Sequence, residues 1–197
     1  MASKTEIANR ALSKLGHPRV SNIDTDSSKA AKAIRFMWDM TRDGLLMAYP
    51  WNFAVKLAQL AADTEEPLFG YTTQYSLPSD FLALISIDNN PEFQFVGGKI
   101  HTSESAPLDI KYISKVTNCG LWDALFNESM ASKLAYEGCE EITQSNTKKQ
   151  MLAQDFATAI KLAYANNSIQ TQQTEYDPDE WLTIRDMYVA DSLYYRL

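Results

Sequence analysis

The chain has 197 residues, 45% of them hydrophobic, and its 18 basic and 25 acidic residues leave a formal net charge of −7. A chain of this length buries about 70% of its unfolded surface and needs no disulfide or metal to fold. The acidic balance argues against tight binding to nucleic acid, which depends on clustered Lys and Arg. An acidic wall can still lie beside DNA and let a duplex slide without sticking.

The cysteines and the N-terminal segment indicate the compartment. Cys119 and Cys139 are too few and too far apart for a disulfide framework or a zinc site, so a reducing compartment is expected and both are interpreted as buried small hydrophobes. The N-terminus is polar, and no run of about 18 apolar residues occurs. The sequence therefore predicts a soluble protein without membrane contact or export signal.

Helical periodicity comes first along the chain. Ser3 and Glu6 have the spacing of a capping box, and Gly16 is suited to the position after a helix end, which predicts a helix over 4–15. Ser27 or Ser28 can cap a second helix over 28–48. That helix carries an apolar stripe from Ala30 to Ala48, with Arg42 placed away from the stripe, and it ends before Pro50.

The period then changes to that of strands over about 52–116. Apolar residues occupy the odd positions from Trp51 to Leu57, and the residues at 81–87 are apolar on both faces, which is typical of a buried strand. Gly97 and Gly98 supply the positive φ that a tight hairpin turn needs. The expected strands span 52–60, 71–77, 81–87, 93–96, 99–102 and 108–112.

Helical periodicity returns near Leu121. It predicts helices over 121–143 and 147–165, the second ending near Asn166-Asn167. Residues 168–176 are rich in Gln and Thr and are expected to form an exposed polar linker. Asp177 as a cap and Pro178 at the first helical position then predict a last short helix.

The fold class expected is α+β and mainly helical. A helical bundle with an inserted small antiparallel β-sheet forms the domain over 1–167, and residues 168–176 link it to an extended C-terminal arm over 177–197. The arm carries an apolar stripe with one arginine, a composition typical of binding hot spots. Two uses stay open for it, docking on a partner and folding back on its own domain. Its candidate contact residues are Trp181, Ile184, Arg185, Tyr188, Tyr194 and Tyr195.

Few residues suggest catalysis. His17 and His101 have no second ligand at metal-binding spacing, and Gly97-Gly98 lies in a hairpin and not between a strand and a helix, so no metal, nucleotide or other cofactor is expected. Glu137, Glu140 and Glu141 could supply the carboxylate pair of a glycoside hydrolase, but carboxylates at this spacing are typical of a solvated helix face. No catalytic residue is assigned.

The chain resembles one family of virion proteins, the head-to-tail adaptors of short-tailed phages, known as tail tubular protein A. The resemblance lies in several short motifs that occur in the same order. The resemblance covers most of the first 165 residues, and each motif by itself is degenerate. The residues that carry it are Ala8, Ala11-Leu12, Leu15-Gly16, Pro18, Arg42, Leu45, Trp51-Asn52-Phe53-Ala54, Leu57, Tyr75-Ser76-Leu77-Pro78-Ser79-Asp80-Phe81, Gly97-Gly98, Ile110-Lys111-Tyr112 and the alanine-rich helices up to Ala165.

This resemblance implies a structural role in the virion. The chain would form a ring, expected to hold twelve copies, between the portal protein and the tail nozzle, with tail fibres as a further neighbour and the genome passing through its bore. It would be assembled in the host bacterial cytoplasm and reside in the neck of the virion. The arm at 177–197 would bind the portal, although this chain departs from better-known members in its long arm and polar linker.

Two other functions compete with the adaptor role. One is a peptidoglycan-degrading virion hydrolase, which would have to use Glu137 or Glu141. The other is a small protein-binding module that is unrelated to virions.

Overall fold

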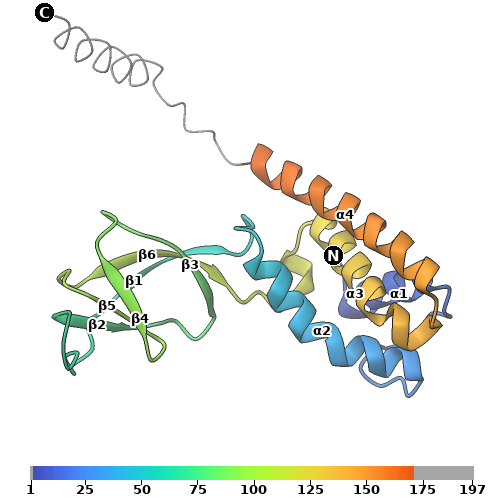
Figure 1. Cartoon of the computed structure of the whole chain (residues 1–197), viewed down its shortest axis with the longest axis horizontal. Coiled ribbons are helices and arrows are strands. Elements are labelled where there is room, and N and C mark those ends of the chain that lie inside the picture. Colours follow the sequence, from blue (N-terminus) through green and yellow to red (C-terminus); the bar gives the residue numbers. More distant parts are fainter. Residues whose placement is uncertain (1, 171–197) are drawn as a thin grey trace, which may run out of the picture.

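The computed structural model describes residues 2–170 and shows an α+β fold with four α-helices and two antiparallel sheets of three strands each. The helices lie at one end of an elongated molecule and the strands at the other, so we distinguish a helical lobe and a sheet lobe (Figure 1). The predicted arm and most of the predicted linker lie outside the described residues. The helices are α1 (Lys4–Leu15), α2 (Lys29–Met47), α3 (Ala124–Thr143) and α4 (Asn146–Ile169).

The first two helices begin where the sequence predicts. The Ser3 hydroxyl accepts from the Glu6 N–H, and the Glu6 carboxylate accepts from the Ser3 N–H, which completes the capping box of α1. Gly16 follows α1 with a φ of 74°, and its N–H donates to the Ser13 carbonyl. Ser28 caps α2 by accepting from the Ala31 N–H. Each cap uses partners within four residues, which is why the sequence reveals it.

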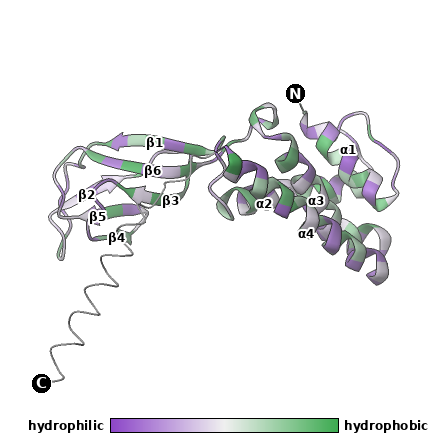
Figure 2. Cartoon of the chain, turned by 90° about the horizontal axis from the view of Figure 1, so that it is seen from above, coloured by the Kyte–Doolittle hydropathy of each residue, from purple (hydrophilic) through white to green (hydrophobic). Residues whose placement is uncertain are grey.

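The six strands form two layers. One sheet has the order β1-β6-β3 and the other β2-β5-β4, all antiparallel. Figure 2 shows one sheet above the other, and the side chains between them form a second core around Tyr75, Ile100 and Tyr112. The strands are β1 (Val55–Leu60), β2 (Thr73–Ser76), β3 (Phe81–Ile87), β4 (Phe93–Val96), β5 (Lys99–Thr102) and β6 (Leu108–Ser114).

The hairpin of β4 and β5 forms as predicted. Val96 pairs with Lys99, so two residues make the turn, and Gly97 and Gly98 have φ values of 58° and 78°. Both angles lie in the left-handed region that this tight turn requires.

Two predictions about the strands were wrong. Residues 52–54 form a turn, so β1 begins at Val55. The turn changes which residues of the strand face the core: Leu60 is buried, while Leu57 is 80% exposed. A shift of this kind moves side chains to the opposite face of a strand. β3 was expected to be buried on both faces, but of its seven residues only Ile87 is buried; Leu82 and Ala83 are half-buried against the helical core, and Ile85 and Ser86 are exposed.

The later helices also differ at their ends. The Asn118 side chain accepts from the Gly120 N–H and caps a 3₁₀ turn at Cys119–Leu121, so α3 begins at Ala124 and Leu121 is exposed. α4 continues through Asn167 to Ile169, beyond the predicted end at 165.

The main core forms around α3, which packs against α1, α2 and α4. Both cysteines are buried there, as predicted. Arg42 was expected away from the apolar stripe of α2, but it is buried. Its guanidinium forms ion pairs with Asp39 and Asp43, each at 2.7 Å, which compensate its charge.

Two chain crossings connect the lobes, one after α2 and one after β6. Ala54 in the first is bound by Ser114 in the second, whose N–H and hydroxyl both donate to the Ala54 carbonyl at 2.8 Å. Trp51 is 1% exposed and donates its indole N–H to the Leu45 carbonyl, while its ring meets Phe126 of α3 edge-on at 4.9 Å. We call this region the junction.

Asn167 ties α4 to the junction. Its side-chain carbonyl accepts from the Asn52 N–H at 2.8 Å, its amide donates to the Pro50 carbonyl at 3.3 Å, and its own backbone carbonyl accepts from the Asn52 side chain at 2.9 Å. Asn167 is 1% exposed, so water cannot replace these partners.

Asn167→Ala is therefore expected to lower the free energy of unfolding by about 2 kcal/mol, because it removes two hydrogen bonds of a buried side chain to the backbone of residues 50 and 52. Urea unfolding followed by circular dichroism measures the change. The matched control is Asn166→Ala, at the neighbouring, less buried position, which should change stability by at most about 0.5 kcal/mol. Equal losses for both variants would contradict the role given to Asn167.

Candidate interaction surfaces

The predicted portal-binding residues are not among those that the structure describes. Trp181, Ile184, Arg185 and Tyr188 all follow residue 170, as do Tyr194 and Tyr195. The described residues instead offer surfaces that can be compared by their chemistry.

The glutamates considered for hydrolysis are held in ion pairs or lie apart on α3. Glu137 binds Lys133 at 2.7 Å, and Glu140 binds Lys149 of α4 at 2.7 Å. The hydrogen bond from Lys149 lowers the pKa of Glu140, whereas a general acid at neutral pH needs a raised pKa. Glu141 contributes its backbone carbonyl to Lys29. This arrangement is that of a solvated helix face.

The histidines lie in different lobes. The Nδ1 atom of His17 is 3.3 Å from the Pro18 carbonyl oxygen, and His101 lies on β5. Among residues 2–170 no three His, Cys, Asp or Glu side chains come together as a metal site. In the same part of the chain, no helix combines the length and apolar character needed to cross a membrane.

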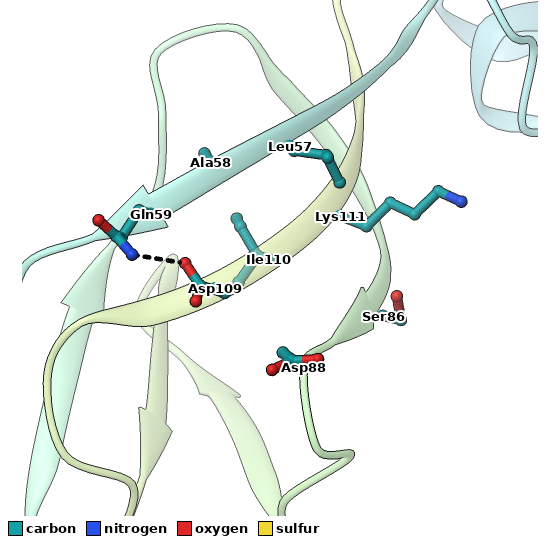
Figure 3. Close-up of a pocket in the computed structure, with 8 residues that line it drawn as sticks. All are labelled: Leu57, Ala58, Gln59, Ser86, Asp88, Asp109, Ile110 and Lys111. Atoms are coloured by element: carbon teal, nitrogen blue, oxygen red, sulfur yellow. Dashed lines mark hydrogen bonds between the residues drawn. The ribbon is translucent and has the colours of Figure 1, made fainter.

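A shallow hollow lined by both apolar and polar residues lies on the β1-β6-β3 sheet. Figure 3 shows Gln59 of β1 donating to Asp109 of β6 at 3.0 Å, while the Asp88 carboxylate lies apart, just beyond the end of β3. The Lys111 side chain points away from both carboxylates in the same view. The hollow therefore presents separate polar groups to solvent, with no pair aimed at a common reacting atom.

An apolar groove lies in the helical lobe between α2 and α4. Phe36 and Met40 of α2 are 87% and 82% exposed, and Phe156 and Tyr164 of α4 line the opposite side. Lys133 and Glu137 of α3 also line it. The sequence indicates this surface, because Phe36 and Met40 are four residues apart and lie outside the predicted stripe. This spacing is typical of a second apolar face on the same helix.

The sheet lobe exposes a different apolar surface. Leu68 and Phe69, in the loop before β2, are 98% and 87% exposed. Val96 of β4 lines the same hollow as these two residues, whereas Phe93 and Phe95 project from the opposite face of that strand, toward Phe81. Contiguous apolar side chains of this kind mark contact sites more often than solvated surface. We call the group of Leu68, Phe69 and Val96 the tip patch.

Charged groups beside the junction link the three strands of one sheet. Asp80, at the start of β3, binds Lys56 of β1 at 2.6 Å and accepts from the Tyr112 hydroxyl of β6 at 3.0 Å. The hydrogen bond from Lys56 lowers the pKa of Asp80, burial opposes this, and the Tyr112 hydroxyl lowers it further. Burial and the Asp80 carboxylate raise the pKa of Tyr112 to about 12.

No model of a protein family matches the chain, and no curated protein matches it.

Asp80 should make the stability of the protein depend on pH in acid. Because its pKa is lower in the folded state than in the unfolded chain, its contribution is present above the ordinary Asp pKa of about 3.9 and is lost as the pH falls through the folded value. Asp80→Asn should therefore be less stable than wild type at pH 7, and the difference should shrink below about pH 4. Urea unfolding from pH 7 to pH 3 measures it.

Lys56→Met is the companion variant, because it removes the group that lowers the Asp80 pKa most. Its loss of stability should fade over the same acidic range. A difference between wild type and Asp80→Asn that stays constant down to pH 3 would refute this assignment.

Proposed function

We propose that this chain is a structural subunit of the head-to-tail adaptor of a short-tailed phage, a ring that joins the portal to the tail nozzle. The observation that carries the proposal is where the family-like motifs lie. The Trp51-Asn52-Phe53-Ala54 motif forms the first lobe crossing, and Asp80 and Tyr112, from two further motifs, bond to each other beside it. The segment at 51–54 fixes how one lobe is held on the other, and the bond between Asp80 and Tyr112 joins strands within the sheet lobe, so both motifs serve the architecture.

The arrangement of elements agrees with the fold that the resemblance implies. On this interpretation the four helices form a bundle, and the two sheets are a module inserted between α2 and α3. The arm at 177–197 then continues from α4 toward the portal.

Two unlike apolar surfaces support assembly of several copies. The groove lies in the helical lobe and the tip patch in the sheet lobe, so a contact between them would join different faces of neighbouring copies. Heterologous contacts of this kind build rings when the rotation closes. The net charge of −7 suits a subunit whose ring surrounds DNA without binding it.

The first test is the mass of the assembly. Native mass spectrometry and electron microscopy of the purified chain mixed with portal should show a ring, for which twelve copies are expected. A monomer or dimer that stays unchanged in the presence of portal would refute the adaptor role and favour a module unrelated to virions.

A second test concerns the arm. Deleting residues from 175 onward should abolish binding to purified portal if Trp181, Ile184 and Tyr188 supply the contact, because the apolar anchors of an interface carry most of its affinity. Binding can be followed by sedimentation. Leu162→Asp, which changes an exposed apolar residue of α4, is the control and should leave portal binding unchanged. Wild-type affinity in the deletion variant would exclude the arm as the portal contact.

A further inference from the structure

The groove between α2 and α4 has the shape of a site for a helix. Both helices pack on α3, which forms the floor between them. The residues that α2 contributes follow the period of one helical face, from Phe36 and Met40 to Gly44 and Ala48. That face is about 18 Å long, which matches an apolar ligand of three to four helical turns.

The floor and rim of the groove leave room for such a ligand. A Cβ atom built on Gly44 would meet no atom within 4 Å, so the groove is open at its centre. Phe36 and Met40 are exposed on one side, and the Phe156 ring lies under the Lys133 ammonium on the other, 5.2 Å from its centroid. Exposed apolar surface of this extent is stabilised by an occupant.

The chain itself leaves the described region beside one end of the groove. α2 and α4 end at the same place, where the Tyr49 ring stacks on Tyr164 at 4.5 Å and the Tyr49 hydroxyl bonds Ser168 at 2.7 Å. Residues 171–176 can span up to about 20 Å, which suffices for the chain to turn back along the groove.

The sequence that follows has the spacing that the groove requires. Trp181, Ile184 and Tyr188 are at i, i+3 and i+7, the pattern of anchors in helix-in-groove binding. Arg185 adjoins this stripe, and the rim of the groove holds Glu137, which already pairs with Lys133 at 2.7 Å and could share its carboxylate with Arg185.

We propose that in the free protein residues 177–197 dock as a helix in the α2–α4 groove of the same chain. Trp181, Ile184 and Tyr188 enter the groove against Phe36, Met40 and Phe156. This contact is independent of the adaptor role, because it concerns the isolated subunit. If the arm also binds the portal, it leaves the groove when the subunit assembles and binds the portal instead.

Trypsin cleavage after Arg185 of the full chain tests this contact, with the released C-terminal fragment followed by mass spectrometry. Met40→Asp places a carboxylate in the apolar groove and should accelerate cleavage at least about tenfold, because the arm loses its site. Met40 makes little contact with the described residues, since it is 82% exposed there, so the variant should keep the wild-type circular dichroism spectrum and the faster cleavage would not reflect loss of the fold. Trp181→Ala should accelerate the same cleavage, because it removes an anchor of the arm and leaves the groove unchanged.

Met151→Asp is the matched control, because Met151 is an exposed methionine of α4 that does not line the groove. Its cleavage rate should equal that of wild type. Equal rates in wild type, Met40→Asp and Met151→Asp would overturn the proposal. Protection that disappears when the wild-type protein is diluted a hundredfold would also overturn it, because the groove would then hold the arm of a second copy.

Discussion

The architecture depends on how two distant crossings of the chain are held together at the junction. A segment of about 60 residues enters the sheet lobe after Trp51 and returns at Ser114, and closing a loop of that length costs conformational entropy. The Ala54 carbonyl, shared by two donors of Ser114, closes this loop at its base. Asn167 then fixes the same turn to the end of α4. Because these groups are buried, the sheet lobe is anchored to the helices and not tethered by a linker.

This anchoring determines what the outer surfaces can do. The tip patch around Leu68 and Phe69 and the α2–α4 groove around Met40 belong to different lobes, and the junction sets the distance between them (Figure 1). Under the proposed adaptor role, a fixed spacing between two unlike apolar surfaces would let neighbouring copies repeat in register. Charged groups hold elements together in both lobes: Glu137 and Glu140 pair with lysines in the helical lobe, and Asp80 links three strands of the sheet lobe.

Sequence patterns predicted the elements best where the deciding partners are local. The ends of α1 and the Gly97-Gly98 turn follow from hydrogen bonds and φ angles within a few residues. The end of α4 was placed too early because asparagines favour helix ends, whereas Asn167 binds a turn 115 positions away and so stays inside the helix. The groove was missed although Phe36 and Met40 showed helical spacing, because a sequence shows that α2 has two apolar stripes but not which one is covered.

The amino-acid sequence by itself determined the order and type of the elements, the caps of α1 and α2, and the burial of the two cysteines. Only the tertiary structure decided that Leu57 faces solvent, that Arg42 is buried between two aspartates, and that α2 and α4 leave a groove over α3. The physical reason is the range of the interactions. Caps and turns are satisfied within about four residues, whereas the burial of a side chain depends on which distant surface packs against it.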